Sequence, residues 1–397
     1  MRHVARDLEP LVRQAAKAFP AVVLTGPRRS GKTHLLRRLL PGASYELFED
    51  PDTIARFQAD PRGFLDGLRL PAVLDEVQNI PELFNYVRSR IDAQRSKKPA
   101  QWFLTGSQEP SLMEHVTESM AGRAAILELL PFSARETPRG SLLHGGYPEV
   151  VADPKHAPLW FRSYVKTYIE RDVRSILAVK DLARFQRFLA LLATRHGQVL
   201  NKSELAAPLG MSIPGIGDWL DVLESTRVVL RVPPYFTNLG KRLIKSPKIY
   251  FADPGLACHL LGLEDEGALA RSPFRGALFE GLIASEIAKS QVHAGKELAL
   301  YFFRDHQGLE VDFLVPLPNG GLRMIEAKAA ATVFPDDARS MRRLAEARSK
   351  SAEACGPMEM FLVHEESKSA PKTRALAPGV EAWPWREFVA DQLPQSS

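Results

Sequence analysis

Eight consecutive residues near the amino end fit the pattern G-x-x-x-x-G-K-[ST] of a phosphate-binding loop, or P-loop. They are Gly26, Pro27, Arg28, Arg29, Ser30, Gly31, Lys32 and Thr33. The glycines allow a sharp turn that directs backbone N–H groups at phosphate oxygens, and the lysine ammonium bridges the outer phosphates. The pattern predicts a site for ATP in which Lys32 is catalytic. A glycine-rich turn without a ligand is the alternative.

The elements around this loop are those that such a site requires. An apolar run at 21–24 indicates a strand directly before the loop, and residues 33–40 favour a helix directly after it. A helix is expected at 8–18 and a second strand at 44–48. A helix that begins at the loop places its positive dipole end at the phosphates.

A third strand ends in two carboxylates. Residues 72–74 are apolar and are followed by Asp75 and Glu76, in the form of a Walker B element. Asp75 would hold Mg²⁺ beside the Thr33 hydroxyl, and Glu76 would orient or deprotonate the attacking water. An acidic pair that only caps a helix is the alternative.

A fourth strand, expected at 101–104, leads into Ser107 and Gln108. These two residues are candidates for sensing the γ-phosphate or the attacking water. Strands that alternate with helices and carry ligand groups at their ends predict an α/β fold, with a parallel sheet and helices on both faces.

These elements resemble an AAA-superfamily ATPase, and five short segments narrow the resemblance. They are LTGS at 104–107, MAGRA at 120–124, LLPFS at 129–133, GGYPE at 145–149 and YIERDV at 168–173. The chain resembles a bacterial and archaeal family in which an AAA-type ATPase is followed by a helical lid, a helix-turn-helix segment and a C-terminal domain of unknown function. The resemblance implies an ATPase core at 1–135, a lid at 136–183, a winged-helix-like segment at 184–269 and a C-terminal domain at 270–397.

Hydrolysis by a P-loop enzyme usually needs one more positive group on the transferring phosphoryl, often an arginine from a neighbouring subunit. Arg123 lies in a turn before the fifth strand, and Arg171 lies on the helix expected to form the lid. Both are candidates for this role. If either acts in trans, the protein assembles into a homo-oligomeric ring, such as a hexamer.

Short helices are expected in the middle segment at 182–193, 202–210 and 213–224, which suggests helix-turn-helix. The third helix carries three acidic residues and no Lys or Arg, which argues against its insertion into the major groove of DNA. Strands at 228–232 and 248–251 would form a wing.

The loop between these two strands is basic. It contains Lys241, Arg242 and Lys245 and ends at Lys248. Such a cluster suits contact with a nucleic-acid backbone. A packing module with a solvated wing is the alternative.

The C-terminal segment predicts a PD-(D/E)xK arrangement. Asp312 is expected on one strand, and Glu326 and Lys328 on the next, where period-two geometry places them on one face. Two carboxylates can hold Mg²⁺ while the ammonium activates water for phosphodiester cleavage. Glu280 or Glu286, from a helix at 274–290, could complete the metal shell. The order of elements resembles the restriction-endonuclease-like fold, and a degenerate domain that only grips nucleic acid is the alternative.

Composition adds weaker constraints. Of 397 residues 45% are hydrophobic and 25% charged, which is ordinary for a soluble protein, and a net charge of +5 mildly favours an anionic partner. No apolar run is long enough to cross a bilayer and no secretory signal is recognisable, so we expect a cytoplasmic protein without a membrane partner. Cys258 and Cys355 are too few and too far apart for a disulfide framework or a zinc site.

Three hypotheses about function follow. The first is an ATP- and Mg²⁺-dependent ATPase that remodels, or moves along, branched or duplex DNA. The second is an ATP-regulated metal-dependent nuclease that uses the C-terminal carboxylates. The third is a signalling or scaffold ATPase whose nucleotide state controls binding to another protein.

Overall fold

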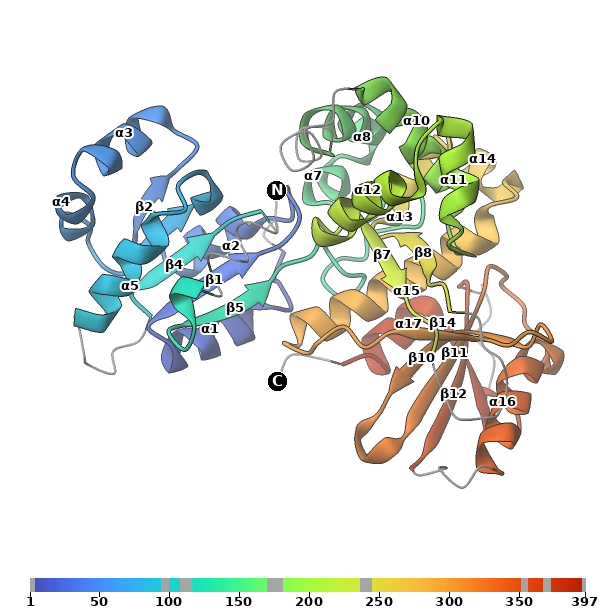
Figure 1. Ribbon diagram of the computed structural model, residues 1–397. Helices are drawn as coiled ribbons and strands as arrows, with labels where there is room; N and C mark the ends of the chain where they lie inside the picture. Colours follow the sequence, from blue (N-terminus) through green and yellow to red (C-terminus); the bar gives the residue numbers. More distant parts are fainter. Residues whose placement is uncertain are drawn as a thin grey trace.

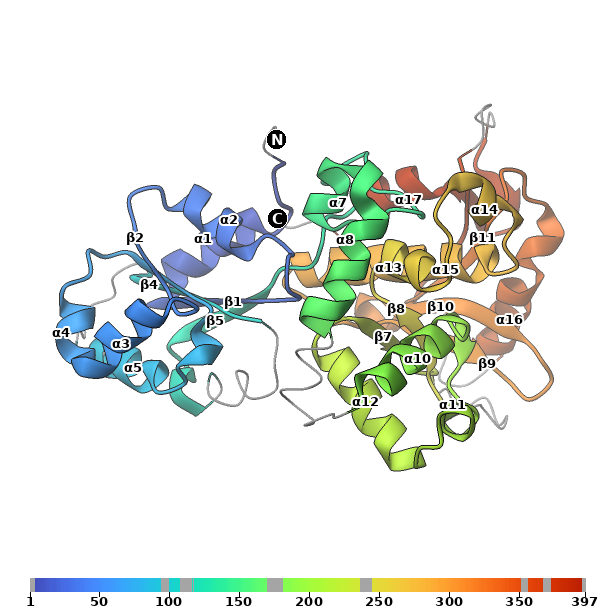
Figure 2. The same ribbon diagram turned by 90° about the horizontal axis from the view of Figure 1, so that it is seen from above.

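The computed structural model describes residues 4–93, 100–107, 116, 118–169, 181–235, 245–350, 356–366 and 373–394. Figure 1 shows two bodies: an amino-terminal sheet with its helices, and a helical middle segment that lies against a second sheet. The long helix α15 (Arg275–His293) extends from the second body toward the first. Seen from above in Figure 2, the same two bodies lie side by side, and α8 and α13 lie close together in the second.

The amino-terminal sheet is entirely parallel, with the strand order β2-β3-β4-β1-β5. Its strands are β1 (Ala21–Thr25), β2 (Ser44–Leu47), β3 (Ala72–Asp75), β4 (Trp102–Thr105) and β5 (Ala124–Glu128). Alternate residues of β1 are buried on opposite faces. One face is covered by α1 (Glu9–Ala18) and α2 (Lys32–Leu39), the other by α3 (Pro51–Ala59), α4 (Pro61–Asp66) and α5 (Leu83–Ala93). The P-loop and the end of β3 therefore meet at the carboxyl edge of the sheet.

The middle segment contains helices that share one hydrophobic core, to which residues from Leu143 to Leu278 contribute. The helices are α7 (Pro148–Ala152), α8 (Ala157–Tyr164), a π-helical turn (Val165–Ile169), α10 (Leu182–Ala193), α11 (Lys202–Leu209), α12 (Ile213–Ser225), α13 (Pro254–Leu260) and α14 (Glu266–Arg271). Ser212 caps the start of helix α12, because its hydroxyl accepts the Gly215 N–H. An antiparallel sheet of order β6-β8-β7 lies beside these helices, formed by β6 (Gln198–Val199), β7 (Val229–Val232) and β8 (Lys248–Phe251).

The C-terminal sheet is mixed and has the order β13-β14-β12-β11-β10-β9. Its strands are β9 (Tyr301–Arg304), β10 (Glu310–Pro316), β11 (Leu322–Lys328), β12 (Met358–His364), β13 (Ala375–Ala377) and β14 (Val380–Pro384). Helices α15 and α17 (Trp385–Asp391) pack on one face, and α16 (Arg339–Ser349) packs on the other. The β10–β11 hairpin is antiparallel, with Phe313 opposite Ile325.

The structure confirms the expected α/β fold and parallel core, and the predicted helices and strands are present with bounds that differ by a few residues. Strand β9 begins at Tyr301, and the Ala299 N–H just before it donates to Gln291 on α15 at 2.8 Å instead of joining the sheet. Across the described ranges, no helix has both the length and the apolar character needed to cross a membrane.

Candidate nucleotide site and C-terminal carboxylate cluster

The P-loop has a backbone conformation suited to a phosphate cradle. Gly26 and Gly31 have φ angles of 134° and 97°. A Cβ atom at Gly26 would lie 2.2 Å from the carbonyl oxygen of Leu129, so only glycine fits there. The buried Lys32 ammonium donates to the carbonyls of Gly26 and Pro27, at 3.0 Å from each. It thus lies inside the loop, where a P-loop lysine meets the outer phosphates.

Asp75, at the end of β3, is the centre of the predicted magnesium site. Its carboxylate is buried and accepts hydrogen bonds from Thr33 Oγ1 at 2.8 Å and from the Tyr45 hydroxyl at 2.5 Å. The Thr105 hydroxyl, at the end of β4, donates to its other oxygen. A hydroxyl and a carboxylate oxygen in contact are the ligands that Mg²⁺ prefers, so the residues present fit this ion.

Glu76 follows in a conformation that is rare for a residue with a side chain, with φ of 58°. Its Oε2 atom accepts from Gln78 Nε2 at 2.5 Å and lies 3.7 Å from the buried Arg28 guanidinium. Its side chain remains 18% exposed. Backbone strain of this kind is held in place by the surroundings and is concentrated at functional sites.

The other predicted catalytic residues lie in different places. Ser107 is buried after β4, and its hydroxyl has no partner among the residues that the structure describes. Arg123 precedes β5, at the edge of the sheet opposite the P-loop, and is paired with Asp92 at 2.7 and 3.0 Å. Gln108 and Arg171 lie outside the described residues. Arg123 does not reach the P-loop of its own chain, so only a neighbouring subunit could offer it a phosphate.

The GGYPE segment links the P-loop to the middle segment. Glu149 Oε1 lies 3.3 Å from the Arg29 guanidinium of the loop. The Gly146 N–H donates to Asp253 at 2.8 Å, and a Cβ atom at Gly145 would lie 2.0 Å from the same carboxylate. A Cβ atom at Gly146 would lie 2.2 Å from the carbonyl oxygen of Phe132, so both glycines are needed for close packing of this connection.

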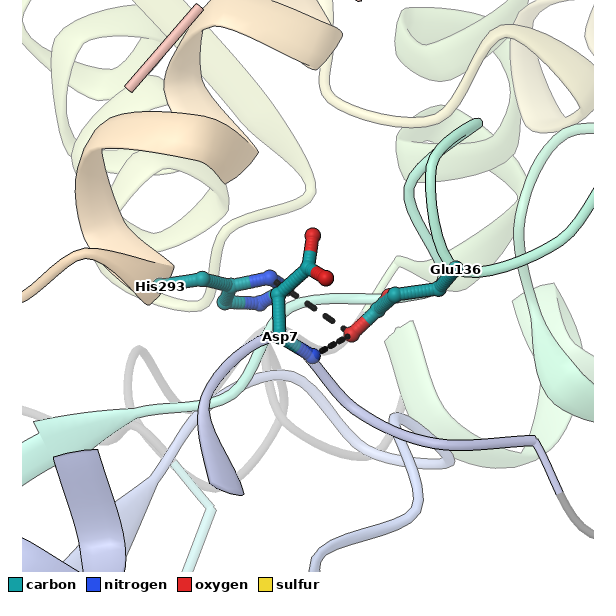
Figure 3. Close-up of side chains that lie close together, drawn as sticks. All are labelled: Asp7, Glu136 and His293. Atoms are coloured by element: carbon teal, nitrogen blue, oxygen red, sulfur yellow. Dashed lines mark hydrogen bonds and ion pairs between the residues drawn. The ribbon is translucent and has the colours of Figure 1, made fainter. Parts of the chain in front are cut away.

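A buried chain of polar contacts joins the P-loop to the last residue of α15, and Figure 3 shows three of its side chains, Asp7, Glu136 and His293. Arg6 donates from Nε to Glu136 at 2.9 Å and from a terminal nitrogen to the carbonyl of Ser30, in the P-loop, at 2.8 Å. The Glu136 side chain is 0% exposed. His293 accepts the Leu130 N–H at Nε2, at 3.1 Å, and its Nδ1 lies 3.8 Å from Glu136 Oε1. The P-loop and α15 are thus joined by one buried chain of contacts.

The ligand atoms of Asp7, Glu136 and His293 lie within 4.8 Å of one another, which is close enough to hold a metal ion (Figure 3). Glu136 Oε1 already accepts from Arg6 Nε and from the Asp7 N–H, and Arg135 lies 3.7 Å from the Asp7 carboxylate. Two guanidinium groups therefore supply the positive charge that a metal would bring. We interpret the cluster as an ion-pair network.

Acid is expected to destabilise this junction through His293. Burial lowers the pKa of His293 from its ordinary 6.5 to about 4. The unfolded chain binds the proton at the higher pH, so stability falls as the pH falls between these values, by about 3 kcal/mol in total. The urea midpoint of the wild type should therefore drop from pH 7 to pH 4.5 more steeply than that of His293→Gln, whose amide oxygen can still accept the Leu130 N–H. Equal slopes would contradict a buried neutral imidazole.

The basic residues of the middle segment are not in equivalent positions. Lys241 and Arg242 lie outside the described residues, and Lys245 is exposed. Lys248 begins β8 and is 2% exposed, so the prediction that it contacts a nucleic-acid backbone is wrong. A nucleic-acid contact needs an accessible ammonium, whereas this one faces carboxylates of the C-terminal domain.

The structure brings Asp312, Glu326 and Lys328 together, with Glu280 of α15 beside them. Lys328 Nζ lies 3.2 Å from Glu326 Oε1, and the Ala327 N–H donates to Asp312 at 2.9 Å. Burial and the neighbouring Asp312 raise the pKa of Glu280 to about 7 and that of Glu326 to about 8. The carboxylates of Glu280, Asp312 and Glu326, with Lys328 beside them, therefore form one group, the C-terminal carboxylate cluster.

Glu286 does not belong to this cluster, which corrects its prediction as a metal ligand. It accepts from the Ala134 N–H at 2.8 Å and from Lys289 Nζ at 2.9 Å, and its side chain is 3% exposed. The reason lies in the helix geometry: positions six apart on α15 do not share a face, and Glu280 takes the face toward β10.

Three family models match successive parts of the chain. An AAA domain covers residues 18–137, and domains of unknown function cover residues 135–267 (DUF8612) and 275–388 (DUF4143). The amino-terminal parallel sheet with its P-loop is therefore the ATPase core of an AAA-superfamily protein.

Two curated relatives match over most of the chain. The uncharacterized protein Rv2008c of Mycobacterium tuberculosis (strain H37Rv) is 35% identical over 346 residues, which cover 85% of this chain and 76% of the relative. The uncharacterized protein Mb2031c of Mycobacterium bovis matches to the same extent. The chain belongs to the family of these mycobacterial proteins. DUF4143 is the C-terminal part of this family member.

Solved structures show weaker likeness. The Walker-type ATPase PABY2304 of Pyrococcus abyssi aligns with a TM-score of 0.43 and 17% identity, over 64% of this chain and 94% of that chain. A RuvB variant of Thermotoga maritima aligns with a TM-score of 0.31 and 16% identity, over 58% of this chain and 90% of that chain.

Several residues of the site were not predicted from the sequence. Tyr45 and Thr105 donate to Asp75, and Arg6 contacts the P-loop. The position of Thr105 at the end of β4 was a usable signal, because strand ends meet at the ligand edge of a parallel sheet. Arg6 carries no such signal, since it precedes α1 and its contacts depend on tertiary packing.

Proposed function

We propose that this family member hydrolyses ATP with Mg²⁺ and uses the energy to remodel DNA, or to move along it, as an oligomeric ring. The observation that carries the ATPase part is the contact of Thr33 Oγ1 with Asp75 at 2.8 Å, directly beside a buried P-loop lysine. A hydroxyl, a carboxylate and an ammonium in this order at one sheet edge are the parts that phosphoryl transfer requires.

Each residue has a defined task in this proposal. Bound Mg²⁺ would neutralise charge on the phosphates, held by Thr33 and Asp75. The Lys32 ammonium stabilises the outer phosphates, and Glu76 orients the attacking water and accepts its proton. Ser107, with its buried hydroxyl, senses whether the γ-phosphate is present.

The DNA part is supported by the middle segment and by α16. Helices α10, α11 and α12 and the antiparallel β6-β8-β7 sheet favour the winged-helix interpretation. The acidic residues of α12 are partly neutralised within the segment, because Arg231 pairs with Asp221 and Glu224. Exposed basic groups remain at Lys245 and at Arg343 on α16. A backbone contact through these groups suits DNA without reading its bases.

The domain division also remains a proposal, with units at 1–135, 136–183, 184–269 and 270–397. The core that extends from Leu143 to Leu278 joins the second and third units into one packed body. The order of α15, the β9–β11 strands and α16 favours the restriction-endonuclease-like interpretation of the last unit.

One measurement tests the proposed function most directly. The ATPase rate is measured alone and with single-stranded, duplex and four-way-junction DNA, beside Lys32→Ala. We expect turnover without DNA and a higher rate with duplex or branched DNA. A rate that no DNA changes would contradict the DNA part, and stimulation by a co-purifying protein would instead support the signalling hypothesis.

Arg123 provides a separate test of the ring. Arg123→Ala should bind ATP normally but hydrolyse it at least about tenfold more slowly, because its guanidinium acts on the phosphate of a neighbouring subunit. Exposed Arg62, changed to alanine, is the matched control. Mixing Arg123→Ala with Lys32→Ala should restore part of the activity, since some interfaces then combine an intact P-loop with an intact arginine. Full activity of Arg123→Ala alone would exclude this arginine. A slow variant that mixing does not rescue would contradict its action on a neighbouring subunit.

A further inference from the structure

The C-terminal carboxylate cluster already contains a cation that comes from another part of the chain. Lys248 Nζ lies 2.7 Å from Glu280 Oε1, 2.6 Å from Glu310 Oε1 and 3.8 Å from Asp312 Oδ1. Glu280 lies on α15 and the other two carboxylates on β10, whereas Lys248 belongs to β8 of the middle segment. The ammonium is thus inserted between two elements of the C-terminal domain.

The lysine is held there by a regular strand. Lys248 pairs with Val232 of β7 and with Val199 of β6, so its backbone is fixed on both sides. Tyr250, two residues further, points to the same face and donates its hydroxyl to Glu280. The Lys248 ammonium also lies over the Phe302 ring, 5.6 Å from Nζ to the centroid. A buried, paired ammonium of this kind is costly to withdraw.

The inserted ammonium conflicts with a metal ion at the same cluster. A metal between the predicted ligands would use Asp312 Oδ1 and Glu326 Oε2, a buried oxygen without a partner in the described part of the chain. Oxygen ligands lie about 2 Å from a divalent ion, so the metal would be within about 6 Å of Nζ, given the 3.8 Å from Nζ to Asp312 Oδ1. Positive charges this close in a buried site repel strongly. Lys328 Nζ, 3.2 Å from Glu326 Oε1, is already one ammonium at this place, so an ion there would face a second one in Lys248. Because Lys248 is also bonded directly to Glu280 and Glu310, the residues present do not fit a resident Mg²⁺ while Lys248 is in place.

We propose that the Lys248 ammonium takes the place of a divalent cation in the C-terminal carboxylate cluster, so that this domain holds no metal while β8 is docked against it. Lys248 is then the counter-ion that joins the middle segment to the C-terminal domain. The cluster serves as an interdomain ion-pair site, and metal-dependent cleavage of nucleic acid is blocked. This proposal is independent of the ATPase activity and of DNA binding.

Binding of Mn²⁺ to the full chain, without nucleotide, tests the proposal. Titrations followed by electron paramagnetic resonance compare the wild type, Lys248→Met and Lys245→Met, which loses the same charge at an exposed position. Asp312→Asn is added to the wild type and to Lys248→Met to identify ions at this cluster. We expect no Asp312-dependent ion in the wild type or in Lys245→Met. Lys248→Met should gain one such ion, and adding Asp312→Asn should weaken its binding at least about tenfold.

Lys248→Met leaves carboxylates unpaired and risks misfolding, so a charge-balanced variant is included. Lys248→Met with Glu310→Gln removes one charge of each sign and keeps Glu280, Asp312 and Glu326. Mn²⁺ should raise the melting temperature of this charge-balanced variant. Any change that Mn²⁺ causes in the wild type should be the same in Asp312→Asn. An Asp312-dependent ion in the wild type, or no gained ion in either folded variant, would overturn the proposal. If neither variant folds, a wild-type Mn²⁺ titration that Asp312→Asn leaves unchanged still supports the proposal.

Discussion

Lys32→Ala is expected to reduce ATP turnover by about 1000-fold or more while the protein stays folded. The ammonium lies inside the P-loop, 3.0 Å from the carbonyls of Gly26 and Pro27, where the proposed function places the transferring phosphoryl. In a buried site, water cannot replace this charge at the same position. Steady-state phosphate release at saturating ATP and Mg²⁺ measures the effect.

The control for this variant is Lys17→Ala, which removes an exposed lysine from the last turn of α1. It should leave turnover within about twofold of the wild type, because a solvated charge far from the phosphates is screened. Circular dichroism melting establishes that both variants are folded. Turnover by folded Lys32→Ala at the wild-type rate would show that the P-loop is not the catalytic site.

Glu136→Ala is expected to destabilise the protein by about 3–5 kcal/mol, the range seen when one partner of a buried ion pair is removed. Its carboxylate accepts from Arg6 Nε at 2.9 Å, from the Asp7 N–H at 2.7 Å and from the Ser133 N–H at 2.8 Å. The variant leaves a buried guanidinium without its counter-ion and two buried N–H groups without an acceptor. Urea unfolding followed by circular dichroism measures the loss.

Exposed Glu297 provides the comparison, since Glu297→Ala should change the free energy of unfolding by less than about 0.5 kcal/mol. Glu136→Gln should fall between the two variants, because the amide keeps an acceptor oxygen but loses the charge. A similar stability for Glu136→Ala and Glu297→Ala would mean that the junction contributes little to the folded state.

Features that depend on residues close in sequence follow from the sequence, whereas contacts between distant elements do not. The P-loop, the acidic end of β3 and the β10–β11 hairpin were predicted because each depends on residues close in sequence. In such segments turn chemistry and side-chain period decide the local geometry. Asp312, Glu326 and Lys328 were expected on one face and do lie together, since the hairpin and the strand period are sufficient to bring them there.

The two corrections, Lys248 and Glu286, concern side chains whose partners lie far along the chain. The sequence places Lys248 at the end of a basic loop, yet its partner Glu280 is 32 residues away and lies on α15. Glu286 contacts the backbone of Ala134, 152 residues away. A charged residue in a sequence carries no mark of whether it will meet solvent, nucleic acid or an opposite charge, because that depends on which elements dock.

The sequence by itself determined the parallel P-loop core, the class of nucleotide chemistry at its edge and the order of the later elements, because periodic burial and short motifs act within one or two elements. Only the tertiary structure decided that Arg6 and Glu136 connect the P-loop to His293, and that Lys248 fills the C-terminal carboxylate cluster. These contacts arise where whole elements pack together. Burial then requires each charge to find a partner, whatever its distance along the chain.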